Sequence, residues 1–202
     1  MASATPARIS KELAALASDG GAAGVSAAPR GDDMRTLDCT IKGPEDTPYE
    51  AGVFKLLCEI PDDYPFVPPK LKFMTKVWHP NISSQTGAIC LDILKDAWTP
   101  AMTLISLLLS VRALLAAAEP TDPQDAQVAR QYLSDRRAFD ATAKAWADAY
   151  ATADGAAGAP PAAPIDARVT QLMEMGFAQD QAEAALASAG NVGGAVAMLL
   201  SG

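Results

Sequence analysis

The sequence WHPNISSQTGAICLDIL, residues 78–94, holds the side chains on which the interpretation of this chain depends. It contains the single histidine, His79, and, eleven residues later, Cys90, one of three cysteines. Polar residues and Gly87 precede the cysteine, which is typical of a loop, and Pro80 stiffens the backbone after the histidine. We therefore predict an ordered loop in which the Cys90 thiol is accessible to solvent.

Three kinds of chemistry are compatible with Cys90 and His79. They could form the nucleophile and base of a cysteine hydrolase, they could be two ligands of a zinc ion, or the thiol could react alone while the histidine is structural. A histidine bounded by a proline is more often a structural hydrogen-bonding residue. Because one histidine and three scattered cysteines offer no paired ligand spacing, we expect no metal site. Cys39 and Cys58 occupy alternating strand positions, which predicts that both are buried.

On the N-terminal side of this segment, the pattern predicts one helix and an antiparallel meander. The helix begins at residues 5–6, a threonine and a proline, and is expected to end at residues 19–21, DGG. Strand patterns follow at residues 35–43, 53–60 and 70–74, where apolar and polar side chains alternate.

On the C-terminal side, residues 104–118, LISLLLSVRALLAAA, are the most apolar run. The run has 15 residues, and two serines and an arginine interrupt it, so it is too short and too polar to span a membrane. We predict a buried helix there, followed by an amphipathic helix with an aromatic stripe at residues 139–150. An order of helix, strands, loop and helices is typical of the α+β class.

The composition changes after residue 151. Residues 152–164 contain no large apolar side chain, which predicts a linker. Residues 165–202 contain three short helical patterns that Gly176 and Gly190 separate, and Asn191 is suited to cap the third helix. We expect a small three-helix bundle in this region.

The overall composition excludes some classes of function. The chain has 202 residues, enough for one ordinary domain and a small one, and half of them are apolar. A net charge of −8 argues against a nucleic-acid-binding or anionic-membrane-binding protein. An odd number of widely spaced cysteines and an N-terminus without a signal-peptide core predict an intracellular protein with free thiols.

The motifs in this order resemble those of ubiquitin-conjugating enzymes. HPN and GAICLDIL, at residues 79–81 and 87–94, are similar to the active-site segment of that family. Four further matches are GDDM, GPEDTPYEAGVF, DYPFVPPK and DPQDA, at residues 31–34, 43–54, 63–70 and 122–126. MEMGF and ALASAGNVGGAVAMLL, at residues 173–177 and 185–200, resemble a ubiquitin-associated (UBA) domain. Together they resemble the 25-kDa subclass, which joins a catalytic domain to a C-terminal UBA domain.

This resemblance implies a fold and a domain organisation. Residues 1–151 are expected to adopt the UBC fold, an α+β domain with an N-terminal helix, a four-stranded antiparallel meander and C-terminal helices. Residues 152–164 would be the linker, and residues 165–202 an all-α three-helix UBA domain. Gly193 and Gly194 lie inside the third of these helices, where each costs about 1 kcal/mol relative to alanine.

The resemblance also implies catalytic roles. Cys90 would carry ubiquitin as a thioester, and Asn81 would donate a hydrogen bond to the oxyanion that forms when an amine attacks. Desolvation beside an oriented Asp122 carboxylate would favour the neutral, attacking form of the incoming lysine, although an aspartate before a proline is also a common turn residue. His79 and Pro80 would hold the loop, and Asp92 matches a gate position.

Three binding surfaces are implied in the same way. The face for ubiquitin ligases and the activating enzyme would comprise Arg8, Lys11, Phe66, Pro100 and Ala101. The UBA surface for ubiquitin would comprise Met175, Gly176, Phe177, Leu199 and Leu200. Ser26 matches a backside surface for a second ubiquitin. Without the resemblance, the helix charges would be a solvated face, Phe66 and Tyr64 would be core, and the UBA residues would be bundle packing.

The sequence therefore predicts an enzyme that passes ubiquitin from Cys90 to a lysine of a substrate or of another ubiquitin. A conjugating enzyme for another ubiquitin-like protein and a non-catalytic ubiquitin-binding adaptor are the alternatives. No cofactor is expected, since ATP is used by the upstream activating enzyme. The expected partners are ubiquitin, the activating enzyme and ligases, with no nucleic acid or membrane, in the cytoplasm and nucleus.

Overall fold

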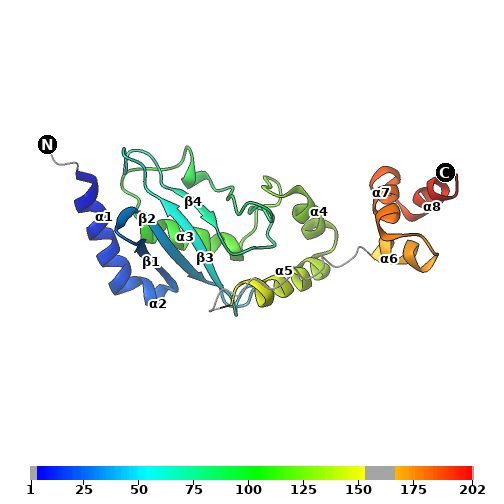
Figure 1. Ribbon diagram of the computed structural model, residues 1–202, viewed down its shortest axis with the longest axis horizontal. Helices are drawn as coiled ribbons and strands as arrows, with labels where there is room; N and C mark the ends of the chain where they lie inside the picture. The colour runs from blue at the N-terminus through cyan, green and yellow to red at the C-terminus, as the bar shows by residue number, and fades with distance from the viewer. Residues whose placement is uncertain (1–3, 153–166, 202) are drawn as a thin grey trace. The chain divides into compact units, whose positions relative to one another are not determined.

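A computed structural model describes residues 4–152 and 167–201 of the chain (Figure 1). The chain divides into two compact units, Met1–Pro161 and Ala162–Gly202. The predicted linker, residues 152–164, lies outside the described residues except for Thr152, so its bounds stay a prediction. The first unit contains α1 (Ala4–Ala15), a π-helical turn (Leu16–Gly20), α2 (Gly21–Ala23), β1 (Val25–Arg30), β2 (Asp33–Lys42), β3 (Val53–Glu59), β4 (Lys70–Phe73), α3 (Leu104–Ala116), α4 (Ala126–Ser134) and α5 (Arg136–Tyr150).

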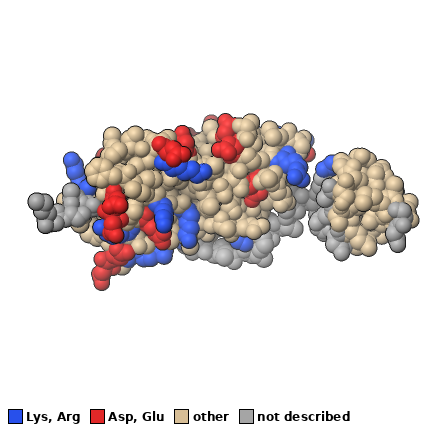
Figure 2. Space-filling view, turned by 90° about the horizontal axis from the view of Figure 1, so that it is seen from above, with Lys and Arg blue, Asp and Glu red and all other residues tan. Residues whose placement is uncertain are grey.

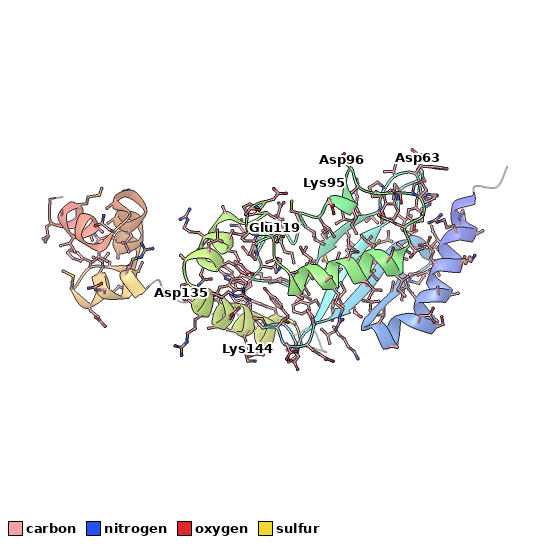
Figure 3. All side chains as sticks on the ribbon, turned by 180° about the vertical axis from the view of Figure 1, so that it is seen from behind. Asp63, Lys95, Asp96, Glu119, Asp135 and Lys144 are labelled. Atoms are coloured by element: carbon pink, nitrogen blue, oxygen red, sulfur yellow. The ribbon has the colours of Figure 1, made fainter. Side chains whose placement is uncertain are left out.

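The four strands form one antiparallel sheet in the order β1-β2-β3-β4, as predicted. In β2 the buried side chains of Leu37, Cys39 and Ile41 alternate with more exposed ones, so one face of the sheet is apolar. Helix α3 lies across one face of the sheet (Figures 1 and 3). Both Cys39 and Cys58 are buried in this core, which confirms the prediction for the two strand cysteines.

Helix α3 is the predicted buried helix, and its start is fixed by the local sequence. The Thr103 hydroxyl accepts from the backbone N–H of Ser106, and the Ser106 hydroxyl accepts from the Thr103 N–H. This capping box satisfies two N–H groups that a helix start leaves unpaired. In the part of the chain that the structure describes, no helix is both long enough and apolar enough to span a bilayer.

One prediction about a helix boundary is wrong. The first helical segment does not end at residues 19–21 but continues through α2, and Gly24 ends it in the left-handed conformation with φ of 74°. Gly20 is helical, and a side chain there would lie 2.6 Å from the Val25 carbonyl oxygen, so this glycine allows close packing against β1. The amphipathic helix predicted at residues 139–150 is confirmed as α5, and Asp135 caps its N-terminus, whereas α4 before it was not predicted.

The second unit contains α6 (Ala167–Glu174), α7 (Gln179–Ala189) and α8 (Val192–Ser201), which confirms three helices. Gly190 takes the left-handed conformation at the end of α7, and the Asn191 side chain accepts from the Gly194 N–H at 2.8 Å. At Gly194 a side chain would lie 2.9 Å from the Ala189 Cβ, whereas Gly193 has more space. Gly194 therefore allows α7 and α8 to approach closely. Of the two glycines, only Gly193 lowers helix stability relative to alanine without a gain in packing.

Charged side chains are mixed on the face of the molecule in Figure 2, where acidic and basic groups of the first unit alternate with neutral surface. No basic stripe crosses that face of the described chain. This distribution agrees with the net charge of −8.

Candidate active site

The candidate site lies in the irregular segment between β4 and α3, which is folded back on itself. Backbone bridges pair His79 with Ile82 and Ile82 with Ile89, and the Cys90 N–H donates to the Asn81 carbonyl at 2.8 Å. Gly87 makes the fold possible because its φ is 74° and a side chain there would lie 1.9 Å from the backbone oxygen of β4. The segment is therefore the ordered loop that the sequence predicts, and it fixes Cys90 relative to the sheet.

His79 is fully buried, and backbone groups use both of its ring nitrogens. Its Nδ1 accepts from the Asn81 N–H at 3.1 Å, so Nε2 carries the proton and donates to the Leu114 carbonyl at 2.9 Å. Burial lowers the pKa of His79 to about 4, although the hydrogen bond to Leu114 favours the charged form. A neutral ring without a free nitrogen cannot serve as the base for Cys90, so this geometry argues against a cysteine hydrolase.

Asn81 is also buried, and its amide is fully engaged. The Nδ2 group donates to the carbonyls of Glu119 at 2.8 Å and Asp122 at 3.0 Å, and Oδ1 accepts from the Glu119 N–H at 2.8 Å. These three bonds tie the active-site loop to residues 119–122. In this structure Asn81 positions that segment, and donation to an oxyanion would require the amide to release one bond.

The Cys90 thiol is partly exposed, and two charged side chains flank it. The sulfur donates to the Asp122 carboxylate, with Sγ and Oδ2 3.5 Å apart. On another side, Lys95 Nζ lies 3.7 Å from Sγ and donates to it. The structure thus brings together Cys90 and Asp122, which are 32 residues apart, and adds Lys95, which the sequence analysis missed.

Asp125 is a second positioning residue that sequence reasoning missed. Its Oδ1 accepts from the Val128 N–H and caps α4, while its Oδ2 accepts from the Ser84 hydroxyl at 2.6 Å. The Pro80 carbonyl accepts from the N–H groups of Gln124 and Asp125, each at 2.9 Å. The position of Asp125 just before α4 could have identified it as a helix cap, but its bond to Ser84 depends on tertiary structure.

Asp92, the predicted gate residue, is exposed at the start of the short 3₁₀ turn Asp92–Leu94. Its Oδ1 accepts from the Ile93 N–H at 2.7 Å, and its carbonyl accepts from the N–H groups of Lys95 and Ala97. Asp92 therefore shapes the turn that presents Lys95. Within residues 4–152 and 167–201, no group of three or more His, Cys, Asp or Glu side chains could hold a metal ion.

Each unit of the chain matches a known protein family. Residues 8–147 match the family described as ubiquitin-conjugating enzyme, and residues 164–199 match the UBA/TS-N domain. The chain belongs to the ubiquitin-conjugating enzyme family.

Related proteins and a solved structure agree with this membership. "Ubiquitin-conjugating enzyme E2 27" of Arabidopsis thaliana is 47% identical over 183 residues, which are 91% of each chain. "Ubiquitin-conjugating enzyme E2 K" of Homo sapiens is 55% identical over 149 residues, 73% of this chain and 72% of the human protein. The E2 domain of a Toxoplasma gondii ubiquitin conjugating enzyme aligns with a TM-score of 0.69 at 52% identity, covering 73% of this chain and 99% of that one.

In this conjugating enzyme, four of the five residues predicted for the ligase and activating-enzyme face line one groove of about 530 Å³. The four are Arg8, Lys11, Pro100 and Ala101. Phe66 is 79% exposed, so the expectation of a core residue, made without the resemblance, is wrong. Tyr64 is buried, which confirms the prediction that it is a core residue. The Trp98 indole donates to the Pro65 carbonyl at 2.7 Å, which connects the turn that carries Phe66 to the loop that carries Pro100 and Ala101.

Glu12 fixes this groove and was not predicted. The residue is 7% exposed, and its carboxylate accepts from Arg8 Nε at 2.7 Å, from the Tyr64 hydroxyl at 2.8 Å and from the Leu104 N–H at 2.8 Å. A buried carboxylate is stable only with such partners. Its position one turn after the buried Ile9 was the available sequence signal, because an acid on an apolar helix face needs a partner.

The second unit of the enzyme exposes part of its predicted ubiquitin surface. Met175 is 54% exposed and Leu200 is 74% exposed, while Phe177 and Leu199 are half-buried against the bundle core. Gly176 has φ of 98°, which favours glycine at the turn after α6. Phe177 and Leu199 thus fit both interpretations, packing and binding. Ser26 is exposed on the sheet and its hydroxyl lies 2.7 Å from that of Thr40.

Proposed function

We propose that Cys90 of this conjugating enzyme receives ubiquitin from the activating enzyme as a thioester and passes it to a lysine amine. The observation that carries this proposal is the environment of the sulfur. Of the three cysteines, all in the described part of the chain, Cys90 alone is partly exposed, and the Asp122 carboxylate lies 3.5 Å from it. Cys39 and Cys58 are enclosed in the core, where no second protein can reach them.

The transfer step needs little base catalysis. The amine nitrogen bonds to the thioester carbonyl carbon, the C–S bond breaks, and Cys90 leaves as a thiolate. A thioester is already activated, so the main requirement is a neutral amine in the correct position. The exposed Asp122 carboxylate is suited to orient the incoming ammonium and to accept its proton.

Asn81 supports this step by holding Asp122 in place. Its amide bonds the carbonyls of Glu119 and Asp122, so loss of the amide would free the segment that carries the carboxylate. An additional oxyanion role, as the resemblance implies, would need the amide to exchange one of these bonds for the oxyanion. His79 and Pro80 hold the loop around them.

Partner binding is assigned to two surfaces that do not include the thiol. The groove beside α1 is suited to the activating enzyme and ligases, because Arg8 and Lys11 provide charge and Pro100 and Ala101 provide an apolar wall. The UBA domain would bind ubiquitin noncovalently through Met175 and its neighbours. No cofactor is required by this chemistry, ATP being consumed by the activating enzyme, and the proposed location is the cytoplasm and nucleus.

One experiment tests the activity and its alternatives. The enzyme is incubated with the activating enzyme, ATP and ubiquitin, and free lysine is then added. We expect an adduct that reductant cleaves and that free lysine discharges. A parallel reaction with another ubiquitin-like modifier and its own activating enzyme should give none. Charging only in the parallel reaction would establish the other modifier, and no adduct in either would establish a binding adaptor.

A further inference from the structure

Three threonines of the chain directly precede a proline: Thr5, Thr47 and Thr99. A threonine before a proline is the minimal substrate of proline-directed protein kinases. Thr47 is half-buried, and its hydroxyl donates to the Pro44 carbonyl at 2.6 Å and accepts from the Tyr49 N–H at 3.2 Å. The Thr5 side chain lies outside the described part of the structure. Because the Thr47 hydroxyl is engaged in its own turn, Thr99 is the candidate for modification.

Thr99 is exposed and lies in a segment without regular secondary structure. Among the described residues, neither its hydroxyl nor its N–H forms a hydrogen bond, while its carbonyl accepts from the Met102 N–H at 3.0 Å. Asp96, three residues earlier, lies at the outer edge of the first unit (Figure 3). A kinase can therefore reach this hydroxyl without unfolding a helix or a strand.

The segment of Thr99 borders the groove proposed for the activating enzyme and ligases. Pro100, the next residue, lines this groove of about 530 Å³ together with Arg8 and Lys11. Arg8 Nη2 donates to the Met102 carbonyl at 2.8 Å, so the guanidinium contacts the same loop. Lys11 is exposed, and within the described residues no carboxylate forms an ion pair with it. Negative charge added at Thr99 would thus lie beside a groove with two cationic side chains.

We propose that Thr99 is a phosphorylation site and that its phosphate weakens binding of the activating enzyme and ligases at the groove. The effect on binding rests on the function proposed for the groove. In the reaction, Thr99 Oγ1 bonds to the γ-phosphorus of ATP, and the bond from that phosphorus to the β-phosphate oxygen breaks. ADP leaves, and the hydroxyl proton passes to the base of the kinase. The phosphate adds about −1.5 to −2 charges at pH 7.

The added charge should affect partner binding and not the transfer chemistry. The phosphate would offset the positive charge that Arg8 and Lys11 present to a partner, and charges at the rim of an interface act mainly on the association rate. Cys90 does not line the groove, so an enzyme that is already charged should pass ubiquitin to free lysine at the normal rate. Charging and ligase-stimulated discharge should both slow down.

The first experiment identifies the site on the folded, full-length enzyme. The natural enzyme, Thr99→Ser and Thr99→Ala are incubated with ATP and a proline-directed kinase, in separate reactions with a cyclin-dependent and a mitogen-activated kinase. The phosphate is then mapped by mass spectrometry. We expect phosphate at position 99 of the natural enzyme and of Thr99→Ser, none at that position in Thr99→Ala, and none on Thr47.

The second experiment measures the effect on binding. After the kinase is removed, phosphorylated and unphosphorylated enzymes are charged with ubiquitin by a limiting concentration of activating enzyme. We expect charging at least about tenfold slower for the phosphorylated enzyme and unchanged discharge onto free lysine. Thr99→Glu and Thr99→Gln form a matched pair that differs in charge but hardly in size. Only Thr99→Glu should slow charging, and added salt should reduce the difference.

The outcomes separate this proposal from the proposed function. Absence of phosphate on Thr99 with both kinases would overturn the proposal, as would equal charging rates for the phosphorylated and unphosphorylated enzymes. Equal rates for Thr99→Glu and Thr99→Gln, or slower discharge onto free lysine after phosphorylation, would overturn the electrostatic effect on partner binding. If the unphosphorylated natural enzyme forms no thioester, the proposed function itself is refuted, whatever the state of Thr99.

Discussion

The buried neutral His79 makes the stability of the first unit depend on pH. Burial lowers the pKa of His79 from 6.5 to about 4. In the unfolded chain the ring binds a proton below about pH 6.5, but in the folded chain it does so only below about pH 4. The contribution of neutral His79 to the unfolding free energy is thus fully present above pH 6.5 and is lost as the pH falls toward 4. The difference corresponds to about 3 kcal/mol of unfolding free energy.

Two assays isolate this contribution. All three tryptophans, Trp78, Trp98 and Trp146, lie in the first unit, so tryptophan fluorescence during urea unfolding reports that unit. The unfolding free energy of the natural protein should fall more steeply between pH 6.5 and 4.5 than that of His79→Asn, which lacks the ring. Because His79 is the only histidine, its NMR ring signals give the pKa directly. They should not titrate between pH 7.5 and 5.

A His79 that titrates with an ordinary pKa would refute this reasoning. A ring signal with a midpoint near 6.5 would show that the two backbone hydrogen bonds do not hold the neutral form. Equal slopes for the natural protein and His79→Asn would show that other groups carry the whole pH dependence.

Three further predictions concern catalysis, packing and the second unit. Asn81→Ala and Asp122→Ala should charge nearly normally and discharge onto free lysine about 10²-fold more slowly. Raising the pH should partly restore the discharge rate of Asp122→Ala. The double variant should discharge no more slowly than Asn81→Ala, because the Asp122 carboxylate depends on Asn81 for its position; rate losses that multiply in the double variant would contradict this. Glu12→Ala should lower the unfolding free energy by about 3 kcal/mol in urea titrations, because three donors lose a buried partner; a loss below about 1 kcal/mol would argue against that role. An enzyme truncated after Ala151 should charge at the full rate but build shorter ubiquitin chains at low ubiquitin concentration, and Phe177→Ala should behave similarly. Identical ubiquitin-chain lengths for the truncated, Phe177→Ala and full-length enzymes would show that the UBA domain does not supply ubiquitin to the active site.

The sequence predicts the sheet well because local chemistry determines it. Alternating apolar residues in β2 and β3 decide which face is buried, and the turn residues between them allow only an antiparallel pair. The end of the first helical segment was not predictable in the same way. Gly20 and Gly21 are typical of a helix end, but Gly20 is helical and packs against β1 where no side chain would fit, and the segment ends at Gly24.

The candidate site was predictable only in part. Cys90 and Asp122 could be named from motifs that resemble a family, but their 3.5 Å separation depends on how the chain folds back. Lys95 and Asp125 have ordinary local patterns, a charged turn residue and a helix cap, and acquire their roles only through contacts with Cys90 and Ser84. The three side-chain hydrogen bonds of Asn81 could not be predicted either, because their partners are backbone groups of another segment.

The identity of the atom that carries ubiquitin tests the central claim most directly. The natural enzyme and the Cys90→Ser and Cys90→Ala variants are charged with ubiquitin, and each adduct is analysed by mass spectrometry with and without reductant. We predict a reductant-sensitive adduct on Cys90 in the natural enzyme, a reductant-resistant ester in Cys90→Ser and no adduct in Cys90→Ala. A reductant-sensitive adduct that persists in Cys90→Ala would contradict the account, since it would place the thioester on Cys39 or Cys58, both of which are buried.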